Sequence, residues 1–164
     1  MFDIPASLLA GIAFNEFGGD PMWVDDIAYV VRQFDHSGDP YLESATVTKE
    51  ADLTSFGNLS TQIKRAAESL GYDLNNLTSE QRESIKSSLK NPVQNIYIAA
   101  KHLSDLRNVD FSGKGASSLT IEDIRIIATR FNRGPNLSLE QIKKNTSYGN
   151  SVVNRIDKLN NLIR

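Results

Sequence analysis

Glu16 is the residue whose type and position most suggest chemistry. It lies near the end of the apolar segment formed by residues 12–17, and two glycines follow that segment at positions 18 and 19. Its aromatic neighbours Phe14, Phe17 and Trp23 favour partial burial, and burial together with the negative end of a helix dipole favours the neutral carboxyl. A carboxyl that keeps its proton near neutral pH can act as a general acid toward a glycosidic oxygen. The alternative is an ordinary exposed glutamate at a helix end.

A second candidate site is the polar stretch from Ser55 to Gln62, which also contains Gly57. Glycine allows a sugar to approach the backbone closely, and serine and glutamine side chains form hydrogen bonds with sugar hydroxyls. The same residues are equally compatible with a helix N-cap at Asn58 or Ser60.

Five segments resemble, in the same order, the motifs of goose-type lysozymes and soluble lytic transglycosylases. They cover nearly the whole chain, at residues 8–19, 54–63, 91–103, 127–135 and 146–153. In that family the catalytic glutamate closes a buried helix just before a glycine turn, so the resemblance implies that Glu16 is the catalytic acid. It also implies a lysozyme-like fold.

The resemblance further implies substrate-binding roles for Ser55, Gly57, Gln62, Phe131, Asn132 and Tyr148. The family has a tyrosine near the catalytic glutamate where this chain has Phe131, so a hydroxyl is missing there. Asn132 corresponds to an asparagine on the cleft floor, and Tyr148 to a tyrosine that faces the cleft, although Tyr148 is also compatible with a core position. The second motif has two extra residues between Gly57 and Gln62. Asn95, in the third motif, fits a structural role better than sugar binding.

The resemblance implies cleavage of the β-1,4 bond between N-acetylmuramic acid and N-acetylglucosamine in peptidoglycan. An inverting hydrolase needs a second carboxylate at about 6.5–9.5 Å from the acid. Asp35 and Asp52 are the preferred candidates, ahead of three other loop carboxylates, Asp39, Glu43 and Glu50. A lytic transglycosylase needs Glu16 alone, because the muramic 6-hydroxyl replaces water and leaves a 1,6-anhydro product. A non-catalytic peptidoglycan-binding module and a helical interaction protein remain as alternatives.

The elements that position these residues are predicted to be helical almost throughout. Apolar residues recur at spacings of three and four, which is typical of amphipathic helices. Between residues 35 and 57 turn residues and a short alternating run indicate an irregular or β-hairpin lobe. We therefore expect a mainly α (α+β) fold and a single lysozyme-like domain over residues 1–164.

Local signals predict where the individual helices begin and end. In the first half of the chain we expect a helix opened by Pro5, an apolar helix over residues 23–34, a helix from Ser60 to Leu70 ended by Gly71, and a helix from a Thr78–Gln81 capping box to Leu89. In the second half we expect a helix opened by Pro92, a loop over residues 111–118, a helix capped by Thr120, and one final amphipathic helix over residues 147–163.

Composition excludes several classes of function. The chain has 164 residues, and 18 Lys and Arg against 20 Asp and Glu give a net charge of −2, which argues against nucleic-acid binding. It has no cysteine, so disulfides, thiolate nucleophiles and Cys-ligated metals are excluded. His36 and His102 lack metal-ligand spacing, and each fits a solvated or hydrogen-bonded histidine better. We expect no metal and no cofactor.

No apolar run approaches the roughly 18–20 residues needed to span a bilayer. The first five residues lack the basic segment and the cleavage site of a signal peptide. Action in the periplasm or cell wall would then need delivery by another route, or membership in a larger secreted protein. An antibacterial effector or a phage-type lysin fits this pattern. The expected partners are peptidoglycan glycan strands and, for an effector, an immunity protein.

Overall fold

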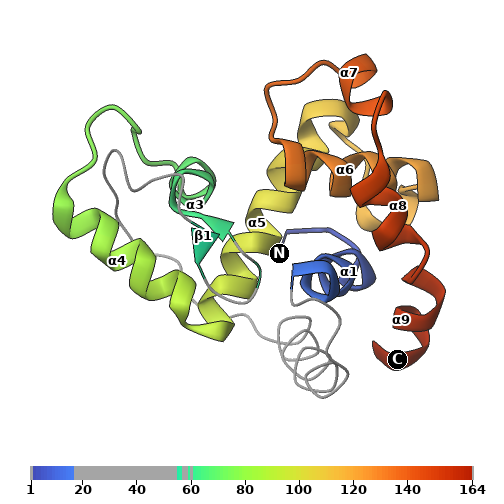
Figure 1. Cartoon of the computed structure of the whole chain (residues 1–164), viewed down its shortest axis with the longest axis horizontal. Coiled ribbons are helices and arrows are strands. Elements are labelled where there is room, and N and C mark those ends of the chain that lie inside the picture. Colours follow the sequence, from blue (N-terminus) through green and yellow to red (C-terminus); the bar gives the residue numbers. More distant parts are fainter. Residues whose placement is uncertain (1, 17–54, 57–58, 60, 164) are drawn as a thin grey trace. The chain divides into compact units, whose positions relative to one another are not determined.

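The computed structural model describes residues 2–16, 55–56, 59 and 61–163, and these residues are mainly helical (Figure 1). They fall into two compact units: the first contains residues 2–16 and 103–163, and the second contains the described residues between 55 and 102. The mainly α class is therefore confirmed, whereas the single domain stays a prediction. Among the described residues, no helix combines the length and the apolarity that crossing a membrane requires.

The second unit begins with a small antiparallel hairpin. Strand β1 (Ser55–Phe56) pairs with β2 (Thr61–Gln62), and helix α3 (Ile63–Leu70) follows directly. Because residues 61 and 62 belong to the strand, the prediction that this helix begins at Ser60 is wrong, and so is the alternative N-cap at Asn58 or Ser60. Most of the lobe expected over residues 35–57 lies outside the described residues, as does the helix expected over residues 23–34.

The other helix boundaries of this unit follow the local signals in the sequence. Gly71 ends α3 with φ of 81°, a left-handed conformation that glycine adopts readily. Helix α4 (Ser79–Lys90) starts at a complete capping box between Thr78 and Gln81, and α5 (Pro92–Phe111) opens with its proline. These predictions are confirmed.

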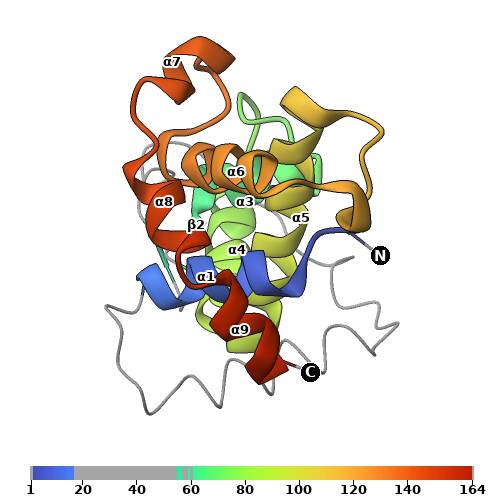
Figure 2. The same ribbon diagram turned by 90° about the vertical axis from the view of Figure 1, so that its right-hand side faces the viewer.

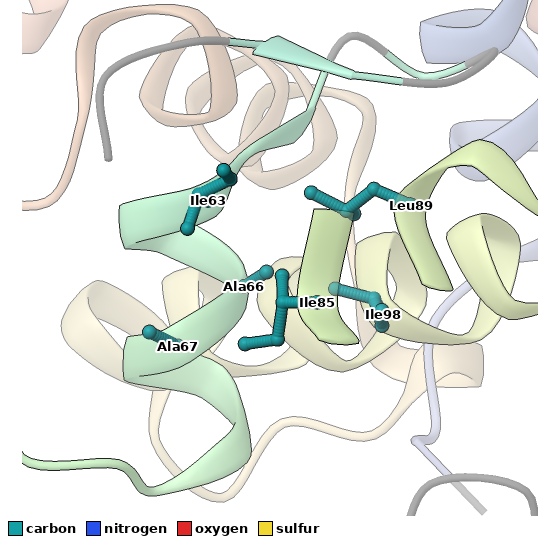
Figure 3. Packing of buried hydrophobic residues seen from close by; sticks show 6 residues of the cluster. All are labelled: Ile63, Ala66, Ala67, Ile85, Leu89 and Ile98. Carbon is teal, nitrogen blue, oxygen red and sulfur yellow. The ribbon is translucent and has the colours of Figure 1, made fainter. Parts of the chain in front are cut away.

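The core of the second unit joins α3, α4 and the first part of α5. Figure 3 shows the side chains that point toward one another there: Ile63, Ala66, Ala67, Ile85, Leu89 and Ile98. The fully buried Asn95 accepts a hydrogen bond from the Leu59 backbone N–H at 2.8 Å and so ties the segment before β2 to α5. Asn95 has the structural role that the sequence favours.

The first unit is built from helices far apart in the sequence (Figure 2). Helix α8 contacts both α1 and α6, and α1 also contacts α9. Their bounds, with those of the shorter elements, are α1 (Ala6–Glu16), η3 (Ala116–Ser118), α6 (Ile121–Arg133), α7 (Leu139–Lys143), α8 (Ser147–Val153) and α9 (Ile156–Ile163).

One prediction for this unit is wrong, and one helix was missed. The single final helix over residues 147–163 is two helices, because the chain turns at Asn154 and Arg155. Helix α7 was not expected, although Ser138 and Gln141 form a capping box that signals its start. The helices opened by Pro5 and capped by Thr120 are confirmed, and the expected loop contains the short helix η3.

A buried ion pair fixes the turn that follows α6. Arg130 is only 1% exposed, and its guanidinium donates two hydrogen bonds to the Asp110 carboxylate of α5. It also donates to the carbonyls of Pro135 and Leu137 at 3.0 and 2.9 Å. Gly134 begins this turn with φ of 88°. The ion pair therefore sets the position of the last turn of α6.

His102, in α5, is a buried neutral histidine. Its Nδ1 lies 3.1 Å from the Ser69 hydroxyl of α3, so the expected hydrogen-bonded role is confirmed, while His36 lies outside the described residues. Burial, followed by the charges of Arg65 and Lys101, lowers the pKa of His102 to about 3. An unfolded histidine has a pKa of about 6.5.

Acidification is therefore expected to destabilise the fold through His102. Below about pH 6.5 the unfolded chain binds a proton that the folded chain does not bind, so this contribution to stability is lost as the pH falls toward 3. In urea unfolding at several pH values, the difference in free energy of unfolding between wild type and His102→Asn should shrink as the pH falls from about 6.5 toward 3. Ser69→Ala, which keeps the buried ring, should retain the pH dependence of wild type. A difference between wild type and His102→Asn that is constant with pH would contradict the prediction.

Candidate active site

The structure brings together Glu16 and Tyr148, two residues predicted from separate motifs. The Tyr148 hydroxyl donates a hydrogen bond to Glu16 Oε1 at 2.5 Å, across 132 positions of sequence. Glu16 is the last residue of α1, and Tyr148 lies in the first turn of α8. Both residues are half-buried, so the bond is partly shielded from water.

The surroundings of Tyr148 keep its hydroxyl protonated. Burial acts first, followed by the hydrogen bond to Glu16 and the negative charge of that carboxylate, and together they raise the pKa of Tyr148 far above its usual value. The Asn15 side chain acts in the opposite direction and does not cancel these effects. Tyr148 is therefore a fixed donor to Oε1, and Oε2 is the carboxyl oxygen that lies outside this bond.

The two residues that precede Glu16 also contact α8 or the turn after it. Asn15 Oδ1 accepts hydrogen bonds from the Ser151 hydroxyl at 2.9 Å and from the Arg155 guanidinium at 3.3 Å. The Arg155 guanidinium lies over the Phe14 ring, 4.7 Å from its centroid. None of these contacts was predicted from the sequence.

Two glycines allow the helices to approach closely enough for these contacts. A Cβ atom on Gly149 would lie 2.2 Å from the Arg125 carbonyl oxygen and 2.5 Å from Thr129 Oγ1, both on α6. A Cβ atom on Gly11 of α1 would lie 2.8 Å from a Val152 methyl of α8. Gly149 directly follows Tyr148, so its packing against α6 fixes the part of α8 that carries the tyrosine.

Phe131 and Asn132 lie in the last turn of α6, in the same compact unit as Glu16 and Tyr148. Phe131 is half-buried and Asn132 is exposed. The neighbouring Arg130 holds this turn through its buried ion pair. Substrate-binding roles for Phe131 and Asn132 stay predictions.

The remaining predicted site residues belong to the other compact unit or lie outside the described residues. Ser55 and Gln62 are paired residues of the hairpin, in the other compact unit. Gly57 lies outside the described residues, as do the candidate second carboxylates Asp35 and Asp52 and the other loop carboxylates named above. Their proposed roles stay predictions.

Within the described ranges, no group of three or more His, Asp and Glu side chains is arranged to bind a metal ion. The expectation that the protein needs neither metal nor cofactor stays a prediction.

Comparison with known proteins gave no match to any protein family, to any curated protein or to any solved structure. The resemblance to goose-type lysozymes and lytic transglycosylases therefore depends on the five sequence motifs alone.

Gly149→Ala is expected to destabilise the protein by about 1–3 kcal/mol or more, because the added methyl would overlap backbone and side-chain atoms of α6. Urea unfolding measures the loss. Asn150→Ala changes the next residue of the same helix, which is exposed, and should stay within about 0.5 kcal/mol of wild type. Equal stability of the two variants would show that α8 does not pack on α6 through Gly149.

Proposed function

We propose that the protein is a peptidoglycan-cleaving muramidase in which Glu16 is the general acid for the β-1,4 bond between N-acetylmuramic acid and N-acetylglucosamine. The observation that carries the proposal is the hydrogen bond from Tyr148 to Glu16. Glu16 and Tyr148 were predicted from two separate motifs. If the resemblance to the family were due to chance, there would be no reason to expect a contact between these two residues. The lysozyme-like fold belongs to the same proposal.

The contact with Tyr148 suits a carboxyl that must give up a proton. Since Tyr148 stays protonated, it donates to Oε1 and leaves Oε2 to carry the proton toward the glycosidic oxygen. When that proton leaves, Glu16 becomes negative, and a hydrogen bond to a charged acceptor is stronger than one to a neutral acceptor. The bond therefore stabilises the charge that develops during cleavage.

Two mechanisms use this acid. In a hydrolase a second carboxylate removes a proton from water, the water oxygen bonds to the anomeric carbon, and the leaving sugar takes the proton of Glu16. In a lytic transglycosylase the muramic 6-hydroxyl attacks instead, and its proton returns to Glu16. We propose hydrolysis as the first mechanism and transglycosylation as the alternative, and the two give different products.

Glu16→Gln is expected to abolish the release of soluble fragments from purified peptidoglycan sacculi. The glutamine amide oxygen can still accept from Tyr148, so the fold should persist while the transferable proton is lost. Glu140→Gln, at an exposed position of α7, is the matched control and should keep full activity. Mass spectrometry of the products identifies the mechanism: reducing ends indicate hydrolysis, and products lighter by one water indicate transglycosylation.

Unchanged activity in Glu16→Gln would refute its role as the acid. A wild-type protein that binds sacculi and releases nothing would instead indicate the non-catalytic binding module.

We propose further that the protein acts in the periplasm or cell wall, as an antibacterial effector or a phage-type lysin. Expression with an added periplasmic signal sequence should then be toxic to bacteria, and Glu16→Gln should remove the toxicity. An effector also requires an immunity protein in the producing cell. Toxicity that appears only in the cytoplasm would contradict this proposal, because the substrate lies outside the inner membrane.

A further inference from the structure

Arg155 touches the ends of two helices at once. It lies in the turn between α8 and α9, and one guanidinium nitrogen donates to the Ser151 carbonyl, to the Ser151 hydroxyl at 2.7 Å and to Asn15 Oδ1 at 3.3 Å. The same guanidinium lies over the ring of Phe14. Asn15 and Phe14 belong to the last turn of α1, and Ser151 belongs to the last turn of α8.

An arginine suits this position for two physical reasons. The final carbonyls of a helix have no partner within it, and both helix ends carry partial negative charge, which a cation complements. The guanidinium also presents several donors in a rigid plane and stacks on aromatic rings, whereas a lysine ammonium does neither. A single arginine can therefore bind the carbonyl end of α8, the Asn15 amide and the Phe14 ring together.

The contacts of Ser151 and Tyr148 lie side by side. Tyr148 and Ser151 are three residues apart on α8 and so share one face of the helix. Their partners, Glu16 and Asn15, are consecutive residues of α1. The two hydrogen bonds are thus neighbouring links between the same pair of helices, and a displacement at one changes the geometry of the other.

We propose that Arg155 is a positioning residue that holds Glu16 against Tyr148. It acts through Asn15 and Ser151, which it orients, and it does not touch the carboxyl itself. Its effect on catalysis rests on the proposed function, whereas its effect on the Glu16–Tyr148 contact does not.

The ionisation of Tyr148 reports this contact without any need for activity. In protein labelled with ¹³C at tyrosine Cζ, the signal of Tyr148 is identified by its loss in Tyr148→Phe. In wild type it should stay neutral at about pH 11, where ordinary tyrosines with a pKa of about 10 are ionised. In Arg155→Met the titration midpoint of Tyr148 should fall toward that ordinary value, so that a tyrosinate signal of Tyr148 appears by about pH 11.

The direction of the shift separates positioning from simple charge loss. Removal of a nearby cation alone disfavours the tyrosinate and moves the midpoint upward, whereas loss of the contact with Glu16 moves it downward. Lys158→Met removes a cation from an exposed position three residues away and should leave the midpoint unchanged. Ser151→Ala removes one link of the network with little risk to folding, and it should shift the midpoint in the same direction as Arg155→Met.

Activity provides the second measurement. On soluble peptidoglycan fragments, Arg155→Met should lower kcat by about 10- to 100-fold with little change in KM, because misplaced catalytic groups affect the reacting geometry more than binding. Arg155→Lys, which keeps the charge and a donor nitrogen, should recover part of the rate. If wild type cleaves nothing, the proposed function fails, and the titration still tests Arg155.

The inference is overturned if Arg155→Met has the titration midpoint and the kcat of Lys158→Met. If Arg155→Met does not fold, Ser151→Ala decides: an unchanged Tyr148 midpoint in that variant would also overturn the inference.

Discussion

Close packing of α8 against helices on both sides is the constraint on which the candidate site depends. Gly149 lets the backbone of α8 meet α6, and Gly11 lets α1 meet α8 near Val152. A Cβ atom at position 149 would meet the Arg125 carbonyl oxygen at 2.2 Å, so a side chain there would force α8 away from α6. Since Tyr148 is next to Gly149 in the chain, a shift of α8 at Gly149 would also move the Tyr148 contact with Glu16.

Polar interactions add orientation to this packing. The Asp110–Arg130 pair is buried, and its guanidinium also satisfies two carbonyls of the turn after α6. A buried ion pair contributes little net stability compared with an apolar pair of similar size, because both charges lose their hydration. Its contribution here is a defined geometry for the end of α6. The hydrogen bonds between the last turn of α1 and the end of α8 fix the position of Glu16 in the same way.

The sequence predicted those features that have a local physical signal. The capping box at Thr78, the proline at the start of α5 and the left-handed Gly71 each marked a helix boundary correctly. The final helix was predicted without its break, because the apolar spacing continues across Arg155 and part of that residue's side-chain contacts are made with a distant segment. The hairpin of β1 and β2 has strands of two residues each, too short for an alternating pattern.

In the candidate site, too, single residues have local signals in the sequence, whereas the contacts between them do not. Glu16 and Tyr148 could be selected one at a time from their own motifs, but their pairing depends on the packing of α1 and α8, which no local signal specifies. Asn15, Ser151 and Arg155 were missed because each is ordinary by itself. Tyr148 and Ser151 are three residues apart on one face of α8, and Arg155 follows four residues later in the turn after it; this spacing could have grouped the three residues.

Under the proposed function, the protonation of Tyr148 bears on both mechanisms. Glu16 must release a proton in either case, and in the transglycosylase it must also recover one from the attacking hydroxyl. A neighbour that exchanged protons in the same pH range would compete for that proton. Tyr148 does not compete, since burial and Glu16 itself keep its hydroxyl protonated. It can therefore stabilise the carboxylate each time it forms and leave the proton transfer to the substrate.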